Sequence, residues 1–198
     1  MNSEVDSPLL SVENLCKSFG KFVANDHVSF DIEKGQIQCL LGENGAGKST
    51  LAKCIYGASK PDSGRIIFKG QEVTFSSPRD AIRQGIGMVH QHFVLSEPMN
   101  AVENIIVGEE STGAILNLEK ETIKIQNLCD QYGVTFDLSL PVSQLSVGQQ
   151  QWIEILKALY VGVDLLLLDE PTAVLTPQEV DRLFAVISKM TAEGISVL

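Results

Sequence analysis

The spacing of apolar and polar residues divides the chain into strand-like and helical segments. Short runs rich in apolar and β-branched residues predict strands at 9–16, 27–32, 36–41, 64–70, 86–90, 164–170 and 195–198. Segments with helical spacing of apolar residues or with helix end signals predict helices at 49–57, 76–85, 101–110, 117–133, 146–160 and 176–194. The continuous apolar run "LLLL" at 165–168 is typical of a strand that is buried in a parallel sheet.

Two of the expected helices carry detailed signals. In the helix at 117–133, one helical face is formed by Leu118, Thr122, Ile125, Leu128, Cys129 and Tyr132. The helix at 176–194 has Thr176 as its cap, Pro177 as its first residue and Glu179 as the second half of a capping box, and Gly194 ends it.

Strands and helices therefore alternate around a purely helical block. This predicts an α/β layer fold with a β-rich N-terminal part, a core at 1–92 and 161–198, and an inserted all-helical subdomain at about 93–160. In such a fold, we expect a ligand at the carboxyl ends of the strands.

Composition narrows the class of protein. The chain has 198 residues, of which 44% are hydrophobic, and its formal net charge is -10. These values suit one ordinary soluble domain and argue against a nucleic-acid surface, which would need a basic face. The polar, acidic start is not a signal peptide, and no apolar run is long enough to span a bilayer.

The four cysteines show no metal-ligand spacing, and together with the missing secretion signal they favour a reducing cytosol. Cys39 lies in the apolar run "IQCLL", so we expect it to be a small core residue.

A glycine-rich loop, "LGENGAGKST", follows that run. Gly42, Gly45, Gly47, Lys48 and Ser49 fit the phosphate-loop pattern G-x-x-x-x-G-K-[ST]. Glycines let backbone N–H groups surround phosphate oxygens, and the helix that follows directs its positive end toward them. Lys48 would neutralise the terminal phosphates, and Ser49 would offer a hydroxyl ligand to Mg²⁺.

The remaining loop residues complete the expected site. Thr50 is placed to touch an inner phosphate, and Asn44 and Ala46 lie in the same loop. The alternative is a glycine-rich turn without a ligand. The motif indicates a nucleoside triphosphate site, but it leaves open a kinase, a GTPase, a motor and a transporter.

Two adjacent carboxylates follow the apolar run "LLLL". Asp169 can hold Mg²⁺, and Glu170 can polarise a water molecule for attack on the γ-phosphate. The alternative is a solvated acidic turn leading to Pro171. The phosphate loop upstream favours the functional interpretation.

The segment "LSVGQ" at 145–149, upstream of "LLLLDEPT", resembles the signature loop of the ATP-binding cassette (ABC) family. The resemblance implies a P-loop NTPase (RecA-like) core that uses ATP and Mg²⁺. It also implies that Ser146, Gly148 and Gln149 form a second anion cradle, which closes over the ATP of another cassette. The alternative for this segment is an ordinary Ser-capped helix.

The resemblance extends over nearly the whole chain. Gln91 matches the family's Q-loop glutamine, which senses Mg²⁺ and couples to the membrane partner, whereas His90 and His92 are not expected to bind metal. Phe19 matches the aromatic residue that stacks on adenine, although a core phenylalanine is the alternative. The segment 173–176 matches the D-loop.

Two departures from the usual pattern point to one branch of the family. Thr176 stands where many cassettes have aspartate, and Val147 stands where many have glycine. Both variants resemble the branch that imports ribose, related sugars and nucleosides. In that branch two cassettes are commonly fused, so we expect a second cassette in the same polypeptide and a switch histidine shortly after residues 195–198.

The resemblance implies an ATP-hydrolysing subunit of a bacterial importer for sugars or nucleosides, peripheral to the cytoplasmic face of the membrane. Its expected partners are permease subunits and, indirectly, an extracytoplasmic solute-binding protein, with no nucleic acid. The alternatives are a soluble cassette acting on ribosomes or DNA and a non-hydrolysing nucleotide sensor. For this chain alone, we expect a monomer with negligible ATPase activity in which Ser146 and Gly148 face solvent.

Overall fold

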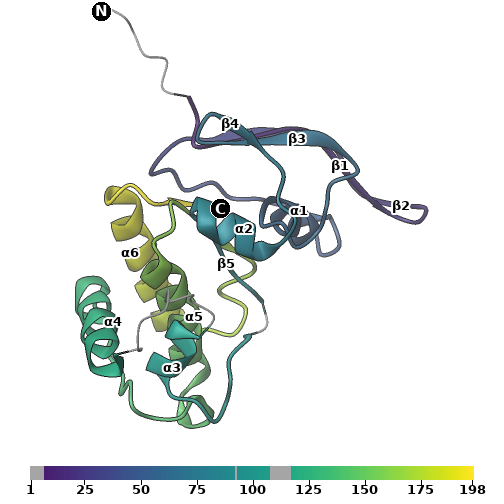
Figure 1. Ribbon diagram of the computed structural model, residues 1–198. Helices are drawn as coiled ribbons and strands as arrows, with labels where there is room; N and C mark the ends of the chain where they lie inside the picture. The colour runs from purple at the N-terminus through teal and green to yellow at the C-terminus, as the bar shows by residue number, and fades with distance from the viewer. Residues whose placement is uncertain (1–6, 92, 108–116) are drawn as a thin grey trace, which may run out of the picture. The chain divides into compact units, whose positions relative to one another are not determined.

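The computed structural model describes residues 7–91, 93–107 and 117–198, and the chain falls into two compact units (Figure 1). The first unit comprises residues 1–87, 164–167 and 190–198, and the second comprises residues 88–163 and 168–189. The subdivision expected from the sequence, with a helical subdomain at about 93–160, stays a prediction. His92 and the end of the helix expected at 101–110 lie outside the described residues.

The first unit contains an antiparallel sheet with the strand order β2-β1-β3-β4. Its strands are β1 (Leu10–Phe19), β2 (Phe22–Ile32), β3 (Ser63–Phe68) and β4 (Gln71–Val73). On β1, Leu10, Val12 and Leu15 are buried. The step of three residues from Val12 to Leu15 coincides with a register shift against β2, which returns the apolar side chain to the core.

The first unit also contains two helices. Helix α1 (Lys48–Ile55) buries Leu51, Ala52, Cys54 and Ile55. Helix α2 (Pro78–Gln84) begins with proline, whose missing N–H costs nothing in the first turn, and ends at Gly85 with a φ of 99°. The sequence therefore predicted the ends of α2 correctly.

The strand expected at 36–41 is wrong. Only Ile37 forms a bridge, with Val197, and Leu41 is 93% exposed. Cys39 is also exposed, so its expected place in the core is wrong. The physical reason is the lack of a pairing partner: strand β7 (Ser196–Val197) offers two residues, and among the described residues nothing continues the ladder beyond Gln38.

The second sheet has the strand order β5-β6-β7. Strand β5 (Ile86–Val89) is buried throughout, and β6 (Leu165–Leu168) is buried except at its last residue. Strands β6 and β7 are parallel. The buried parallel strand predicted from "LLLL" is confirmed, as is the α/β class.

The second unit is mainly helical. Its elements are α3 (Ala101–Ile106), α4 (Leu118–Tyr132), the 3₁₀ turn η1 (Val142–Gln144), α5 (Val147–Val161) and most of α6 (Pro177–Ala192). Helix α5 packs against α3 and α4, which lie beside it in Figure 1. Its side chains Ile153, Ile155 and Leu156 are almost completely buried.

The apolar face predicted for α4 is correct only in its later turns. Ile125, Cys129 and Tyr132 are buried, whereas Leu118 and Thr122 are exposed. The first turns of α4 border an open hollow instead of a packed neighbour, and both residues line it. These two positions are a correction to the sequence prediction.

The buried side-chain amide of Asn104 forms hydrogen bonds with the loop before α3. Asn104 is 1% exposed, and its Oδ1 accepts the N–H of Ser96 at 2.7 Å. Its Nδ2 donates to the carbonyls of Ser96, Met99 and Asn100 at 3.0 to 3.3 Å. Asn104 thus gives the Ser96 N–H its partner and adds a second donor to three carbonyls that also accept backbone N–H groups.

We predict that Asn104→Ala lowers the free energy of unfolding by about 2 kcal/mol, because it leaves the Ser96 N–H without its partner and removes three further hydrogen bonds from a buried side chain. The measurement is urea denaturation of the purified protein followed by circular dichroism. The control is Gln126→Ala, which removes an exposed amide bonded to Asp130 on α4 and should stay within about 0.5 kcal/mol of the wild type. Equal shifts for the two variants would contradict the role given to Asn104.

Candidate functional site

The glycine-rich loop runs over the surface of the first unit and enters α1 at Lys48. Gly45 and Gly47 have φ angles of 84° and 91°, in the left-handed region that favours glycine. A Cβ atom at Gly47 would lie 2.1 Å from the carbonyl oxygen of Ala24, so only glycine fits there. At Gly45 a Cβ would meet nothing within 4 Å, so the tip of the loop is open.

Lys48 lies across this loop. Its Nζ donates to the carbonyl oxygens of Gly42 and Glu43 at 2.7 and 2.9 Å. These bonds place a full positive charge at the centre of a turn whose residues 42–46 are exposed. The cation, the open loop and the helix start together fit an anion such as a triphosphate.

Asn25, which the sequence analysis did not single out, supports the loop through a hydrogen bond. Asn25 on β2 is 5% exposed, and its Nδ2 donates to the carbonyl of Gly47 at 3.1 Å. Its Oδ1 is buried and has no hydrogen-bond partner among the described residues. The available signal was an asparagine inside a strand, where this residue type is depleted.

Phe19 lies at the end of β1, and it is not a core residue. Its side chain is 55% exposed, and Lys17 Nζ lies 5.5 Å from the ring centroid. Phe22, its cross-strand partner, is 59% exposed. The core alternative for Phe19 is therefore wrong, and its ring is accessible for stacking.

The two carboxylates expected at the end of β6 belong to the second unit. The N–H of Asp169 donates to Val89 O at 3.1 Å, which ties the end of β6 to the end of β5. Glu170 follows with a φ of 52°, an uncommon value for a residue with a side chain. The backbone therefore turns sharply where the two acids lie.

Gln91 and Glu170 meet directly, although 79 positions separate them in the sequence. The Nε2 of Gln91 donates to Glu170 Oε2 at 2.9 Å. Both residues follow the ends of neighbouring strands, Gln91 after β5 and Glu170 after β6. The structure thus brings together the two residues that the sequence suggested for catalysis.

Ser146 caps α5. Its Oγ accepts the N–H of Gln149 at 3.3 Å, and its own N–H donates to Gln149 Oε1 at 2.8 Å. Ser146 is exposed as expected, but Gly148 is buried. A Cβ at Gly148 would lie 2.0 Å from Glu179 Oε1, so the carboxylate of α6 covers this glycine. The expectation that Gly148 faces solvent is therefore wrong.

Glu179 also completes the capping box predicted for α6. Its Oε2 accepts the N–H and the hydroxyl of Thr176 at 2.8 and 2.9 Å. The backbone hydrogen bond from Thr176, followed by the hydroxyl bond, lowers the pKa of Glu179. A carboxylate of the same unit thus lies against the start of α5.

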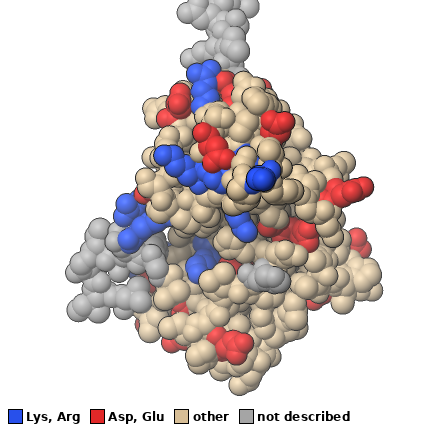
Figure 2. Space-filling view, turned by 90° about the vertical axis from the view of Figure 1, so that its right-hand side faces the viewer, with Lys and Arg blue, Asp and Glu red and all other residues tan. Residues whose placement is uncertain are grey.

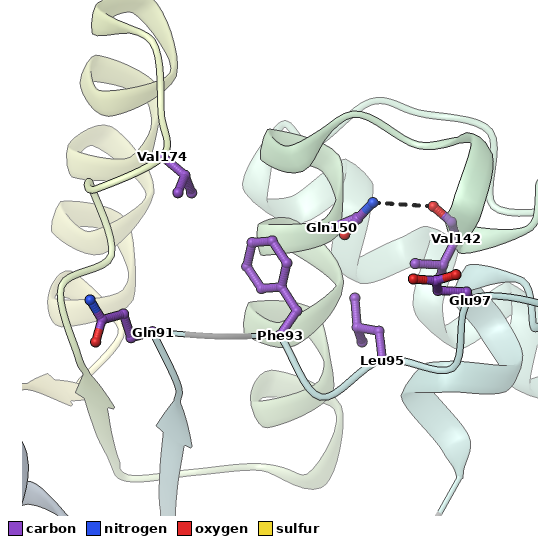
Figure 3. A pocket seen from close by; sticks show the side chains of 7 residues that line it. All are labelled: Gln91, Phe93, Leu95, Glu97, Val142, Gln150 and Val174. Carbon is purple, nitrogen blue, oxygen red and sulfur yellow. Dashed lines mark hydrogen bonds between the residues drawn. The ribbon is translucent and has the colours of Figure 1, made fainter.

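A cavity of about 300 Å³ opens beside this region of the second unit (Figure 3). It is lined by Gln91, Phe93, Leu95, Glu97, Val142, Gln150 and Val174. Glu154 on α5 is 6% exposed and accepts the N–H of Val94 at 2.8 Å, which holds the segment that carries Phe93 and Leu95. The cavity is therefore a groove with mixed apolar and polar walls and with Gln91 at one edge.

Comparison with known proteins places the chain in a family. The sequence profile of the family described as ABC transporter matches residues 25–173. The chain is 44% identical to the glucose import ATP-binding protein TsgD13 of Haloferax volcanii, over 96% of this chain and 40% of the relative. It is 45% identical to the nucleoside import ATP-binding protein NupA of Lactococcus lactis, over 96% of this chain and 38% of the relative.

The chain thus spans about two fifths of the length of the curated relatives it matches. A solved nucleotide-free ATP-binding cassette from an ABC transporter superimposes with a TM-score of 0.86 at 30% identity, over 96% of this chain and 80% of that one. A second, described as the ADP conformation of an ATP-binding cassette, gives 0.85 at 29% identity, over 96% and 80%. The matched sequence profile and this shared fold show that the chain belongs to the ABC transporter family.

Proposed function

We propose that the protein binds ATP with Mg²⁺ and hydrolyses it to power a bacterial importer of sugars or nucleosides. The observation that carries hydrolysis is the hydrogen bond between Gln91 and Glu170, because it joins a carboxylate fit to act as a base to the glutamine that the family uses beside it. Two relatives, a glucose import ATP-binding protein and a nucleoside import ATP-binding protein, support the solute class.

Each group has a proposed part in nucleotide binding. Lys48 exchanges its bonds with Gly42 and Glu43 for the terminal phosphates, and the N–H groups of the loop bind the remaining phosphate oxygens. The ring of Phe19 stacks on the adenine. Asn25 holds the Gly47 carbonyl, which keeps the loop in the shape that the phosphates need.

The proposed hydrolytic step uses the second unit. Asp169 and Gln91 of this unit offer oxygen ligands of the kind that Mg²⁺ prefers, and a bound ion would neutralise charge that develops on the phosphates. Glu170 accepts a proton from the attacking water. Gln91 holds the Glu170 carboxylate at 2.9 Å and so orients the base.

The proposed partners follow from the remaining surfaces. Ser146, Gly148 and Gln149 serve the nucleotide of a second cassette, and a permease subunit occupies the groove beside Gln91. Among the described residues, no helix is both long and apolar enough to cross a bilayer. On the face in Figure 2, basic and acidic side chains are interspersed, which supports a protein partner more than a nucleic acid.

We predict that Lys48→Ala weakens binding of Mg²⁺–ATP at least ~10-fold, equivalent to about 1.4 kcal/mol, because the loop loses its full positive charge. The fold should survive, since Lys48 bonds to exposed carbonyls. Isothermal titration of the full-length protein measures the affinity. The control is Lys53→Ala, which removes an exposed lysine at the other end of α1 and should leave the affinity unchanged. Unchanged binding by Lys48→Ala would overturn the assignment of the phosphate loop.

We predict that Glu170→Gln leaves ATP binding intact and lowers the turnover number at least ~100-fold, because the amide cannot accept the proton of water. Steady-state phosphate release by the full-length protein measures turnover. Glu119→Gln, an exposed glutamate in the first turn of α4, is the matched control. Turnover by Glu170→Gln equal to that of the wild type would move the base to another residue.

The importer itself is tested in vesicles that contain the full-length protein and its permease. We expect uptake of a sugar or nucleoside that requires ATP inside the vesicle and is lost in Glu170→Gln. Recovery of ribosomal or DNA complexes without any membrane protein would favour a soluble cassette. Tight ATP binding with no single-turnover hydrolysis would favour a nucleotide sensor.

A further inference from the structure

A cluster of three metal-ligating side chains lies on the antiparallel strands β1 and β2. The ligand atoms of Cys16, Asp26 and His27 all lie within 4.8 Å of one another. We propose that these residues form a binding site for a borderline-soft divalent transition-metal ion, such as Zn²⁺. This site is separate from the oxygen ligands proposed for Mg²⁺.

The strand register explains how the three residues meet. Leu15 pairs with Val28 and Lys17 pairs with Asn25, with register shifts between these pairs. One residue of β1, Cys16, therefore faces two residues of β2, Asp26 and His27, as in a β-bulge. His27 has a φ of 48°, so its side chain departs from the regular alternation of the strand.

Hydrogen bonds already hold the ligands near one another. The backbone N–H of His27 donates to Cys16 Sγ at 3.2 Å, and His27 Nδ1 lies 2.7 Å from Asp26 Oδ1. Ligands on one tetrahedral ion lie about 3.3 to 3.7 Å apart, so the side chains must move by about 1 Å to close around an ion. An N–H donor to sulfur also supports a metal-bound thiolate, as outer-shell bonds commonly do.

The chemistry of the ligands selects the ion. A thiolate and an imidazole favour Zn²⁺ and its neighbours over Mg²⁺ and Ca²⁺, which prefer oxygen ligands. Three protein ligands leave a fourth position for water. The side chains of Asp26 and His27 are 77% and 72% exposed, so the ion can enter from solvent.

The cluster lies next to the residue that supports the phosphate loop. Asp26 follows Asn25, whose side chain holds the Gly47 carbonyl, and the Ala24 carbonyl packs against the same glycine. An ion at this cluster would thus bind one residue away from the support of the phosphate loop. The sequence concealed the cluster because Cys16 lies ten or more positions from the other ligands and no cysteine or histidine spacing marks it.

The test is a Co²⁺ titration of the reduced, metal-free, full-length protein in excess Mg²⁺, which fills oxygen-ligand sites. We expect one equivalent of Co²⁺ to bind with a sulfur-to-cobalt charge-transfer band in the near ultraviolet, and Zn²⁺ to displace it. Cys16→Ser should abolish that band. Asp26→Asn and His27→Asn should each weaken binding at least ~10-fold.

The variants separate ligand loss from misfolding. Asparagine adopts a left-handed φ, as residue 27 requires, more readily than most residues with a side chain. His27→Asn therefore removes a ligand with little strain. Asp31→Asn, an exposed carboxylate elsewhere on β2, is the control and should bind Co²⁺ like the wild type. Circular dichroism verifies the fold of each variant. Absence of the sulfur-to-cobalt band in the wild type, or equal Co²⁺ affinity in His27→Asn and the wild type, would overturn the proposal.

Discussion

The close approach of Gly47 to strand β2 is the constraint on which the proposed nucleotide site depends. The Ala24 carbonyl lies where a Cβ of Gly47 would be, and Asn25 bonds to the Gly47 carbonyl from the same strand. Because Lys48 follows directly as the first residue of α1, these contacts fix the start of the helix. The loop is thus shaped by an earlier strand through one amide and one carbonyl group, neither of which is charged.

The contact between Gln91 and Glu170 in the second unit depends on how two buried strands end. The Val89 carbonyl accepts the Asp169 N–H, so β5 and β6 stay paired up to the point where polar residues begin. Beyond that point Glu170 adopts a φ of 52°, and its carboxylate meets the Gln91 amide. A residue held in this uncommon conformation costs about 1 kcal/mol or more, and such strain persists where the surrounding structure holds it in place.

Much of the fold could be predicted because local patterns and packing agree. The apolar run of β6, the capping box of Thr176 and Glu179, and the glycine that ends α2 all form as the sequence indicates. Lys48 begins a helix after the glycine-rich loop, as the sequence indicates, whereas the direct contact between Gln91 and Glu170 was not predicted. The predictions that were wrong concern positions whose burial depends on a residue distant in the sequence. Cys39 is exposed because its segment lacks a paired strand, and Gly148 is buried by Glu179. Nor can sequence spacing show that Asn25 supports Gly47 or that Cys16 faces His27, because both contacts depend on strand register.

Helix α5 links the proposed signature segment to the groove of the second unit. Its N-terminus is capped by Ser146, and Gln150 lines the groove. Glu154 accepts the N–H of Val94 at 2.8 Å, between the lining residues Phe93 and Leu95. Glu154 is almost completely buried, so losing that partner would cost about 1 to 3 kcal/mol. A partner that displaces Val94 must therefore either break this bond or move α5 with it. Since a helix moves as a rigid element, movement of α5 would also shift Ser146, which gives an occupant of the groove a physical route to the signature segment.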